Sequence, residues 1–407
     1  MKKIQVYEKK YSNMNSFLLM LYIFTPILTL PLKNFLNSGL SVWVLTAIIL
    51  IISLYINKNK LNFKAIVIIF GIIMIFLINY LLLSFEEETT HLLIEFIKFG
   101  AIPFYLASTI KNTENIYKYW LVLGILNFVI LLFYIEQINE REFNYMTFGR
   151  YMSLSFIIFS YYYYKGKFKV SMFFLMLITM IAVFIFGNRS SILIIILIVF
   201  YFEIKKLIQK RTLMQYFKLT LITIGLIYLI SNIKKLVYKL IYLLEINNLN
   251  SYSFKKLIAL FDNNTTSFVS GRDNIYFDSV KLIYKNNLMP KGIGYYQNVT
   301  EHVYPHNVFF DIMITFGFIG VLLILSVAII SIIKYIKISN LYIKQLILIL
   351  GIYQFTILNF SGTFWSESIM WMLFGLLISN NFVSKDETKI SSINAINTIN
   401  NRGLLNE

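Results

Sequence analysis

Long apolar segments recur along nearly the whole chain, and they constrain its fold more than any other feature of the sequence. A helix that crosses a bilayer needs about 20 mostly apolar residues. Charged residues make up 14% of the chain, whereas soluble domains carry about 25%. The sequence therefore predicts an all-α integral membrane protein with about twelve transmembrane helices. The expected spans are 15–32, 39–56, 64–84, 91–108, 117–135, 147–164, 168–186, 188–203, 214–231, 306–333, 342–359 and 365–382.

The basic residues indicate how these helices are oriented. Cytoplasmic loops of membrane proteins carry an excess of lysine and arginine. Basic residues are frequent in every second segment between spans, starting with the N-terminal one, and the short segments between these hold Lys33, Arg141, Arg150 and Arg189. We therefore expect both termini in the cytoplasm. A net charge of +17 would suggest nucleic acid for a soluble protein. Here the basic loops account for the charge, so we expect the bilayer, and no nucleic acid, as the partner.

The chain divides into four regions on this topology. Residues 1–231 hold spans one to nine, 232–305 form a large external loop between spans nine and ten, 306–383 hold spans ten to twelve, and 384–407 form a disordered cytoplasmic tail. The loop opens with a basic amphipathic stretch, which is typical of helices that lie in the headgroup layer. A second helix-like stretch and a Pro-Lys-Gly-Ile-Gly turn at 290–294 follow. Loops of this length are commonly functional when they are ordered.

Candidate site residues gather where even-numbered spans begin, which is the outer side. Helix N-termini attract anions through free N–H groups and the helix dipole. Spans six, eight and ten begin near a cation or a histidine, and the loop adds another cation. Next to these lie further polar or aromatic groups. The whole set is Arg150, Asn188, Arg189, Arg272, Tyr276, His306, Asn307 and Glu367. This pattern indicates an outward-facing anion pocket built from separate helix ends.

Each of these residues also has a simpler explanation. A single arginine at a helix end can be an interfacial anchor. Arg272 can pair with Asp273 at the surface, where an ion pair contributes under about 1 kcal/mol. His306 can cap its helix.

Several kinds of chemistry are excluded or disfavoured by what the sequence lacks. The chain has no cysteine, which excludes disulfides, zinc–thiolate sites and cysteine nucleophiles. It has no phosphate-binding glycine loop of the Walker type and no Gly-x-Ser-x-Gly elbow. The run Glu86-Glu87-Glu88 is most simply a solvated acidic turn. We therefore expect no metal and no cofactor.

The order of the motifs resembles the O-antigen polymerase and O-antigen ligase superfamily of bacterial envelope glycan assembly. An arginine at a helix start is followed by a large external loop with a second arginine, a glycine turn and a helix that begins with histidine. The motifs are Gly187-Asn188-Arg189-Ser190-Ser191, Gly271-Arg272-Asp273, Pro290-Lys291-Gly292-Ile293-Gly294, Pro305-His306-Asn307 and Phe316-Gly317-Phe318-Ile319-Gly320. One departure is that the aromatic residue four positions after the loop arginine is Tyr276, where the family usually has tryptophan.

The resemblance implies a metal-independent, GT-C-like membrane glycosyltransferase on the outer face of the bacterial cytoplasmic membrane. The donor would be an undecaprenyl-pyrophosphate-linked oligosaccharide. Arg189 and Arg272 would bind the pyrophosphate, and His306 would take the proton of the acceptor hydroxyl. Arg150, Asn188, Asn307, Tyr276 and Glu367 would be substrate-binding residues. A flippase and a chain-length regulator of the same pathway would be partners.

Three activities remain open at this level. The first is a repeat-unit polymerase, which adds glycan to another lipid-linked repeat unit of an O-antigen, capsule or related polysaccharide. The second is a ligase that transfers the glycan to lipid A core or another acceptor. The third is a lipid-linked oligosaccharide flippase. Transporters tend to have repeated halves and ionisable groups in broken helices at the membrane midplane. Here the halves differ and most of the charge is expected at the outer surface, so the polymerase is the favoured prediction.

Overall fold

The regular structure of the described part of the chain is helical. The computed structural model describes residues 2–32, 38–58, 61–83, 86–111, 113–138, 144–246, 251, 253–254, 257–258, 272–300, 302–360 and 362–379. Helices and short helical turns are the elements found there, with no strand among them. The predicted all-α class is therefore confirmed. The expected tail, 384–407, lies outside the described residues.

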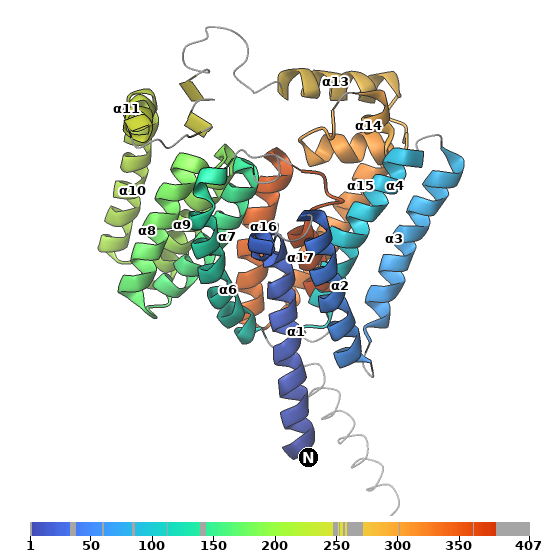
Figure 1. Cartoon of the computed structure of the whole chain (residues 1–407), viewed down its shortest axis with the longest axis horizontal. Helices are drawn as coiled ribbons and strands as arrows, with labels where there is room; N and C mark the ends of the chain where they lie inside the picture. The colour runs from blue at the N-terminus through green and yellow to red at the C-terminus, as the bar shows by residue number, and fades with distance from the viewer. Residues whose placement is uncertain are drawn as a thin grey trace, which may run out of the picture.

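The elements run as follows along the chain (Figure 1). They are α1 (Lys2–Leu28), η1 (Leu30–Leu32), α2 (Ser38–Asn57), α3 (Phe63–Leu82), α4 (Glu86–Glu95), η2 (Phe96–Ala101), α5 (Ile102–Ser108), α6 (Glu114–Phe133), η3 (Ile135–Gln137), α7 (Tyr145–Tyr164), α8 (Lys169–Phe186), α9 (Arg189–Lys210), α10 (Leu213–Ser231), α11 (Ile233–Ile246), α13 (Arg272–Lys285), α14 (Tyr295–Val299), α15 (Val308–Lys337), α16 (Leu341–Phe360) and α17 (Ser368–Ile378).

Eight helical segments of the described chain are long and apolar enough to cross a membrane. They are Leu40–Asn57, Phe63–Leu82, Glu87–Ser108, Glu114–Phe133, Lys169–Phe186, Leu213–Ser231, Val308–Lys337 and Leu341–Phe360. Asn13–Leu28 and Ser368–Ile378 form shorter apolar helices. The chain is thus a multi-pass helical membrane protein.

Two of the twelve expected spans, 147–164 and 188–203, fall in α7 and α9, which are not among those eight segments. Their composition gives the reason. α7 is rich in serine and tyrosine, and α9 carries Arg189, Glu203 and several lysines. A helix lies over each of the twelve expected ranges, and the count of twelve crossings stays a prediction.

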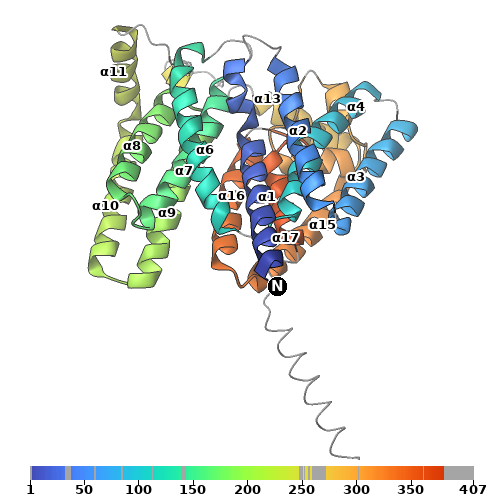
Figure 2. The ribbon, with the colours of Figure 1, turned by 60° about the horizontal axis from the view of Figure 1, so that its bottom comes forward.

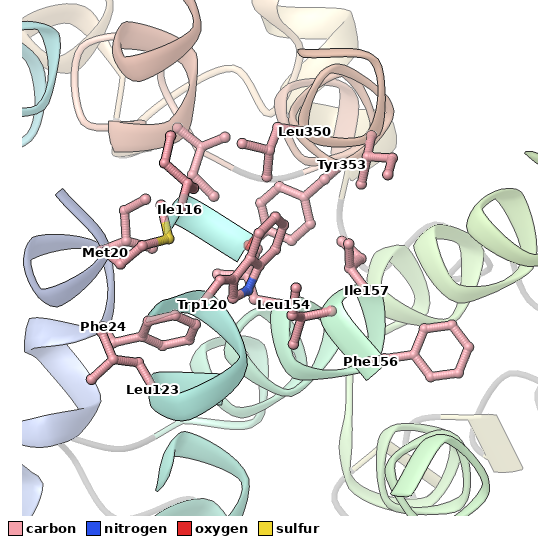
Figure 3. Close-up of a cluster of buried hydrophobic side chains, with 14 of the residues drawn as sticks. Met20, Phe24, Ile116, Trp120, Leu123, Leu154, Phe156, Ile157, Leu350 and Tyr353 are labelled. Carbon is pink, nitrogen blue, oxygen red and sulfur yellow. The ribbon is translucent and has the colours of Figure 1, made fainter. Parts of the chain in front are cut away.

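Helix α7 lies at the centre of the main core, which explains its polar composition. Residues Met152 to Tyr162 are all buried. Figure 3 shows side chains of α1, α6, α7 and α16 meeting around Trp120 and Tyr353. The serines of α7 are satisfied within this core, since Ser155 donates to the carbonyl of Gly124 and accepts from the Asn127 amide at 2.7 Å. Hydrogen bonds of this kind hold membrane helices together where apolar packing cannot select a partner.

Helix α10 has the opposite environment. It has no buried residue, and its main neighbours among the described elements are α9 and α11. Its exposed side chains are apolar, and the same is true of much of α3, α8 and the second half of α15. An apolar surface of this extent is unusual for a soluble monomer. It is the surface expected of helices that face lipid tails.

The long helix α15 is interrupted at Gly317, where the backbone has φ 61° and ψ −162°. The segment 288–292, from the loop that precedes α15, crosses this break. Gly292 N–H donates to the Thr315 carbonyl at 2.9 Å, and Phe318 N–H donates to the Leu288 carbonyl at 2.9 Å. Backbone groups that the break leaves without helical partners are therefore satisfied by the loop, as backbone inside a membrane requires.

The same loop segment is anchored on its other side by α3. The Asn79 amide donates to the carbonyl of Ile293 at 2.9 Å, and its oxygen accepts from the Ile293 N–H at 2.7 Å. Thr89 of α4 donates to the same carbonyl at 3.0 Å. Gly292, at φ 93°, has no room for a side chain because a Cβ would lie 2.5 Å from the Asn79 oxygen. The loop is thus clamped between α3, α4 and α15.

We expect Gly317→Ala to destabilise the protein strongly. An alanine would take up a backbone conformation that costs about 1–3 kcal/mol for residues other than glycine. Its Cβ would also lie 2.5 Å from the Leu288 carbonyl oxygen and 2.6 Å from the Pro290 nitrogen. Thermal unfolding of the purified protein in detergent measures the effect. Gly351→Ala is the matched control, because Gly351 lies in α16 with nothing near its Cβ position. Equal melting temperatures for the two variants would contradict this account of the break.

Candidate functional site

The turn between α8 and α9 presents Arg189 at the first position of a capped helix. Asn188 is the N-cap, and its side-chain oxygen accepts the N–H of Ser191 at 3.2 Å. Its amide nitrogen donates to the Ser190 hydroxyl at 2.8 Å. The local sequence therefore fixes the helix start, and Asn188 acts as the cap.

Helix α7 approaches this turn through a glycine. A Cβ on Gly149 would lie 2.6 Å from the Ser191 hydroxyl and 2.8 Å from the Asn188 side-chain oxygen. The Phe-Gly-Arg sequence at the start of α7 thus allows two helix starts to touch. From the loop side, the hydroxyls of Ser251 and Ser253 donate to the carbonyls of Ile185 and Gly187. These bonds tie the beginning of the loop between α11 and α13 to the same turn.

The start of α15 holds His306 in a conformation that side chains rarely adopt. Its φ is 56°, in the left-handed region. The next residue, Asn307, caps α15, since its side-chain oxygen accepts the N–H groups of Phe309 and Phe310 at 2.9 and 3.4 Å. The ring of Tyr304 lies 4.3 Å from the imidazole, centroid to centroid. Asn307 is therefore the cap of α15. His306 lies between this cap and Pro305 in the sequence, and its ring packs on Tyr304.

One cavity brings the predicted catalytic residues together. It has a volume of about 140 Å³, and Arg189, Arg272 and His306 all line it, as does Asn188. These side chains come from the start of α9, the start of α13 and the segment before α15, which are far apart in the sequence. Ser190 and Ser253 add hydroxyl groups, and the other lining residues are aromatic or aliphatic apart from Gly187. No described residue of the lining is acidic.

The charges around this cavity favour an anion. Burial, followed by the positive charge of Arg272, lowers the pKa of His306 from 6.5 to about 4, although the backbone of Phe360 opposes this shift. Arg189 also interacts unfavourably with Arg272. The Nδ1 atom of His306 is buried and has no hydrogen-bond partner. Two guanidinium groups beside a neutral imidazole can hold an anion and accept a proton near it.

Arg150 and Glu367 pair with each other. Their side chains make a salt bridge of 3.1 Å, and the carboxylate also accepts from the Gln354 amide at 3.4 Å. Gly362 has φ 108°, and a Cβ there would lie 2.1 Å from the Glu367 carboxylate. The pair lines a separate cavity of about 330 Å³ with Tyr22, Glu95 and others. Arg150 is therefore neutralised by Glu367, although its charge still reaches His306.

A third cavity, of about 400 Å³, is rich in acids and hydroxyls. Glu87, Glu88 and Glu95 line it, together with Thr300 and Tyr304. Tyr304 interacts electrostatically with Arg150, Glu367 and Arg272. Tyr304 therefore lines the acidic cavity and also packs on His306, which lines the cavity with Arg189 and Arg272. The acidic cavity offers many hydrogen-bond partners for hydroxyl groups.

The remaining predicted residue and two unpredicted ones complete the arrangement. Tyr276 does not line the cavity with the arginines; its ring packs edge-on against Phe310, with centroids 5.6 Å apart, and so fixes α13 on α15. Tyr304 and Glu95 were not predicted as site residues. The sequence could have indicated Glu95, since an ionisable residue inside an apolar span is by default a candidate functional residue. Within the described residues, no group of three or more His, Asp or Glu side chains is arranged to hold a metal.

No protein-family model and no curated protein matches this chain.

We expect the stability of the protein to fall as the pH drops from 6.5 towards 4, in part because of His306. Its pKa is about 4 in the folded protein against an ordinary 6.5. Between these two pH values the imidazole binds a proton in the unfolded chain but stays neutral in the folded chain. The contribution is fully present above pH 6.5 and is lost towards pH 4. His306→Gln should therefore flatten the dependence of Tm on pH over this range. Parallel curves for the two proteins would contradict a buried, neutral imidazole.

We expect Glu367→Gln to destabilise the protein more than the double variant Arg150→Met, Glu367→Gln. Removing one member of a buried ion pair costs roughly 3–5 kcal/mol, because the other charge is left uncompensated. The cost here should be smaller, since the Arg150 side chain keeps 25% of its exposure. Thermal unfolding of the two single variants and the double variant forms a closed cycle. Strictly additive effects would show that the two side chains do not depend on each other.

Proposed function

We propose that this chain is a polysaccharide repeat-unit polymerase of the cytoplasmic membrane of bacteria. It transfers glycan from undecaprenyl pyrophosphate to a hydroxyl of another lipid-linked repeat unit on the outer face of that membrane. The observation that carries the proposal is the shared cavity of Arg189, Arg272 and His306. Three segments predicted from separate motifs contribute to it, as the resemblance to the O-antigen polymerase and ligase superfamily implies.

The cavity suits the leaving group of such a reaction. Arginine stays charged and binds phosphate oxygens through two parallel N–H bonds. Because the cavity of about 140 Å³ is smaller than the roughly 300–1,000 Å³ of a typical ligand pocket, it accommodates the diphosphate and leaves the sugars outside. As the bond between the sugar C1 and the phosphate oxygen breaks, negative charge grows on that oxygen. Arg189 and Arg272 stabilise it at that moment.

His306 takes the proton of the attacking hydroxyl. In the absence of a diphosphate the two arginines and burial keep its pKa near 4. A bound diphosphate offsets the charge of the arginines, so the pKa of His306 rises when the donor is in place. The imidazole is then a stronger base in the complex than in the free protein. The acceptor oxygen forms its new bond to C1 as the proton moves to the ring.

The acidic cavity provides the place for the acceptor sugar. Tyr304 lines it and also packs on His306, with ring centroids 4.3 Å apart. Carboxylates, amides and hydroxyls bind sugar hydroxyls, and Gln297, Thr300 and Ser366 supply such groups beside the glutamates. An acceptor hydroxyl from this cavity would meet the base at the boundary with the arginines.

The proposed topology has twelve spans with both termini in the cytoplasm and a GT-C-like arrangement. The helix starts that build the cavity, those of α7, α9 and α15, then face outwards. α13 and α14 lie across the same end of the bundle, and the N-terminus lies at the other end (Figure 1). In this proposed topology the site would lie at the membrane surface, where the pyrophosphate of a polyprenyl lipid is found.

We expect purified protein in proteoliposomes to extend a synthetic undecaprenyl-pyrophosphate oligosaccharide into a ladder of products. His306→Ala should lower the rate by about 10²–10⁴-fold, the usual contribution of a positioned base. Arg189→Ala and Arg272→Ala should abolish the ladder, and EDTA should leave the wild-type ladder unchanged.

Arg211→Ala is the matched control, because Arg211 lies at the opposite end of the same helix, α9. It should retain the wild-type rate. A normal ladder from the Arg189 and Arg272 variants would refute the diphosphate site. Transfer to lipid A core with no ladder would identify a ligase, and movement of intact donor across the bilayer would identify a flippase.

A further inference from the structure

A large basic cavity lies at the opposite end of the bundle from the candidate site. α7, α9 and α15 begin at that site, and their far ends meet the start of α16 around this basic cavity. Its volume is about 720 Å³, and Lys165, Lys205 and Lys344 line it with Tyr201, Tyr335 and Tyr342. At 1.5 Å per residue the 22 residues of α9 cover about 33 Å. Lys205 lies 16 residues after Arg189 on this helix, so the two cavities are about 24 Å apart along α9.

Each lysine of this cavity lies over a tyrosine ring. The Lys165 ammonium is 4.3 Å from the ring centre of Tyr342, Lys205 is 5.9 Å from Tyr201, and Lys344 is 5.8 Å from Tyr335. Lys344 also donates to the carbonyl of Ile336 at 3.0 Å. Cation–π contacts hold an ammonium group in place without cancelling its charge. The lysines are thus positioned and remain positive.

Little negative charge opposes these three lysines. Burial and then the positive charge of Lys167 lower the pKa of Lys165, while the carboxylate of Glu114 opposes the shift. Glu114 also bonds to the hydroxyl of Tyr342. Glu203, near the same end of α9, forms a salt bridge with Lys218 and accepts a hydrogen bond from the hydroxyl of Tyr164. No described residue of the lining is a carboxylate. The cavity therefore has a surplus of positive charge.

The rim of the cavity is apolar and open. Ile204, Ile208 and Leu341 line it and are 44%, 66% and 77% exposed. A free inorganic anion would use the lysines and leave these side chains uncovered. A ligand with a phosphate head and an acyl chain uses both parts. This end also carries the α9–α10 turn and lies on the side of the N-terminus of α1 (Figure 2), where the basic loops gather.

We propose that this cavity binds the phosphate headgroup of an anionic membrane phospholipid, whose acyl chain lies along Ile204, Ile208 and Leu341. Basic pockets between membrane helices on the cytoplasmic side recognise such headgroups. The lysines act as point charges on the phosphate, and the hydroxyls of Tyr201 and Tyr335 and the amide of Gln345 bond to its remaining oxygens or to the glycerol. The site is independent of the proposed sugar transfer and needs no activity to be detected.

The test is lipid binding to the purified full-length chain, measured by native mass spectrometry with phosphatidylglycerol, phosphatidylcholine and inorganic phosphate as separate probes. We expect phosphatidylglycerol to bind and phosphatidylcholine to bind far more weakly. The triple variant Lys165→Gln, Lys205→Gln, Lys344→Gln should bind phosphatidylglycerol about 100-fold more weakly, because each lysine contributes to the attraction.

The control is the triple variant Lys167→Gln, Lys206→Gln, Lys337→Gln. It removes the same charge from the same end of the bundle, but these residues do not line the cavity. It should bind phosphatidylglycerol like the wild type. Equal losses in the two triple variants, equal binding of the two phospholipids, or displacement of phosphatidylglycerol by millimolar inorganic phosphate would each overturn the proposal. Lys205→Gln alone, with a smaller loss, keeps the test decisive if the triple variant does not fold.

Discussion

The insertion of residues 288–294 between α3 and the broken helix α15 is the interaction on which the arrangement of the candidate site depends. It satisfies the backbone at the Gly317 break and pairs both backbone groups of Ile293 with Asn79. The segment before it carries α13 with Arg272, and the segment after it leads through α14 to His306. The clamp therefore fixes the positions of two cavity residues that are not themselves part of it.

The arginines near the candidate site fall into two groups, one paired with a carboxylate and one in a cavity lined by no described acidic residue. Arg150 is paired with Glu367, and the pair ties the start of α7 to the segment before α17. Arg189 and Arg272 line a cavity in which no described residue is acidic. Repulsion between like charges raises the free energy of the empty cavity, and an anion relieves it. The same positive charge keeps the neighbouring His306 neutral, because this charge and burial both oppose protonation of the imidazole.

Much of the fold follows from hydropathy, and part of the site follows from chain topology. The apolar spans predict their helices because exposure to lipid leaves a strong signal. Arg189, Arg272 and His306 were predicted together because alternate helix starts face one side of a membrane. The partner of Arg150 was not predicted, since no spacing rule relates residues 150 and 367. The role of Asn79 was also hidden, because an asparagine inside an apolar span does not reveal which loop it binds. The Gly317 break was missed because the apolar composition on both sides of it is continuous.

The break in α15 also bears on how the chain is assembled during synthesis. Leu288 and Gly292, which satisfy the break, and Asn79, which anchors their segment, all precede α15 in the sequence. Chains emerge from the ribosome N-terminus first. The partners of the broken backbone therefore exist before the helix itself is made. In the proposed orientation the loop has already crossed the membrane when α15 enters the bilayer. The broken backbone of α15 can then bond to the loop at once, and α15 need not insert as a continuous helix.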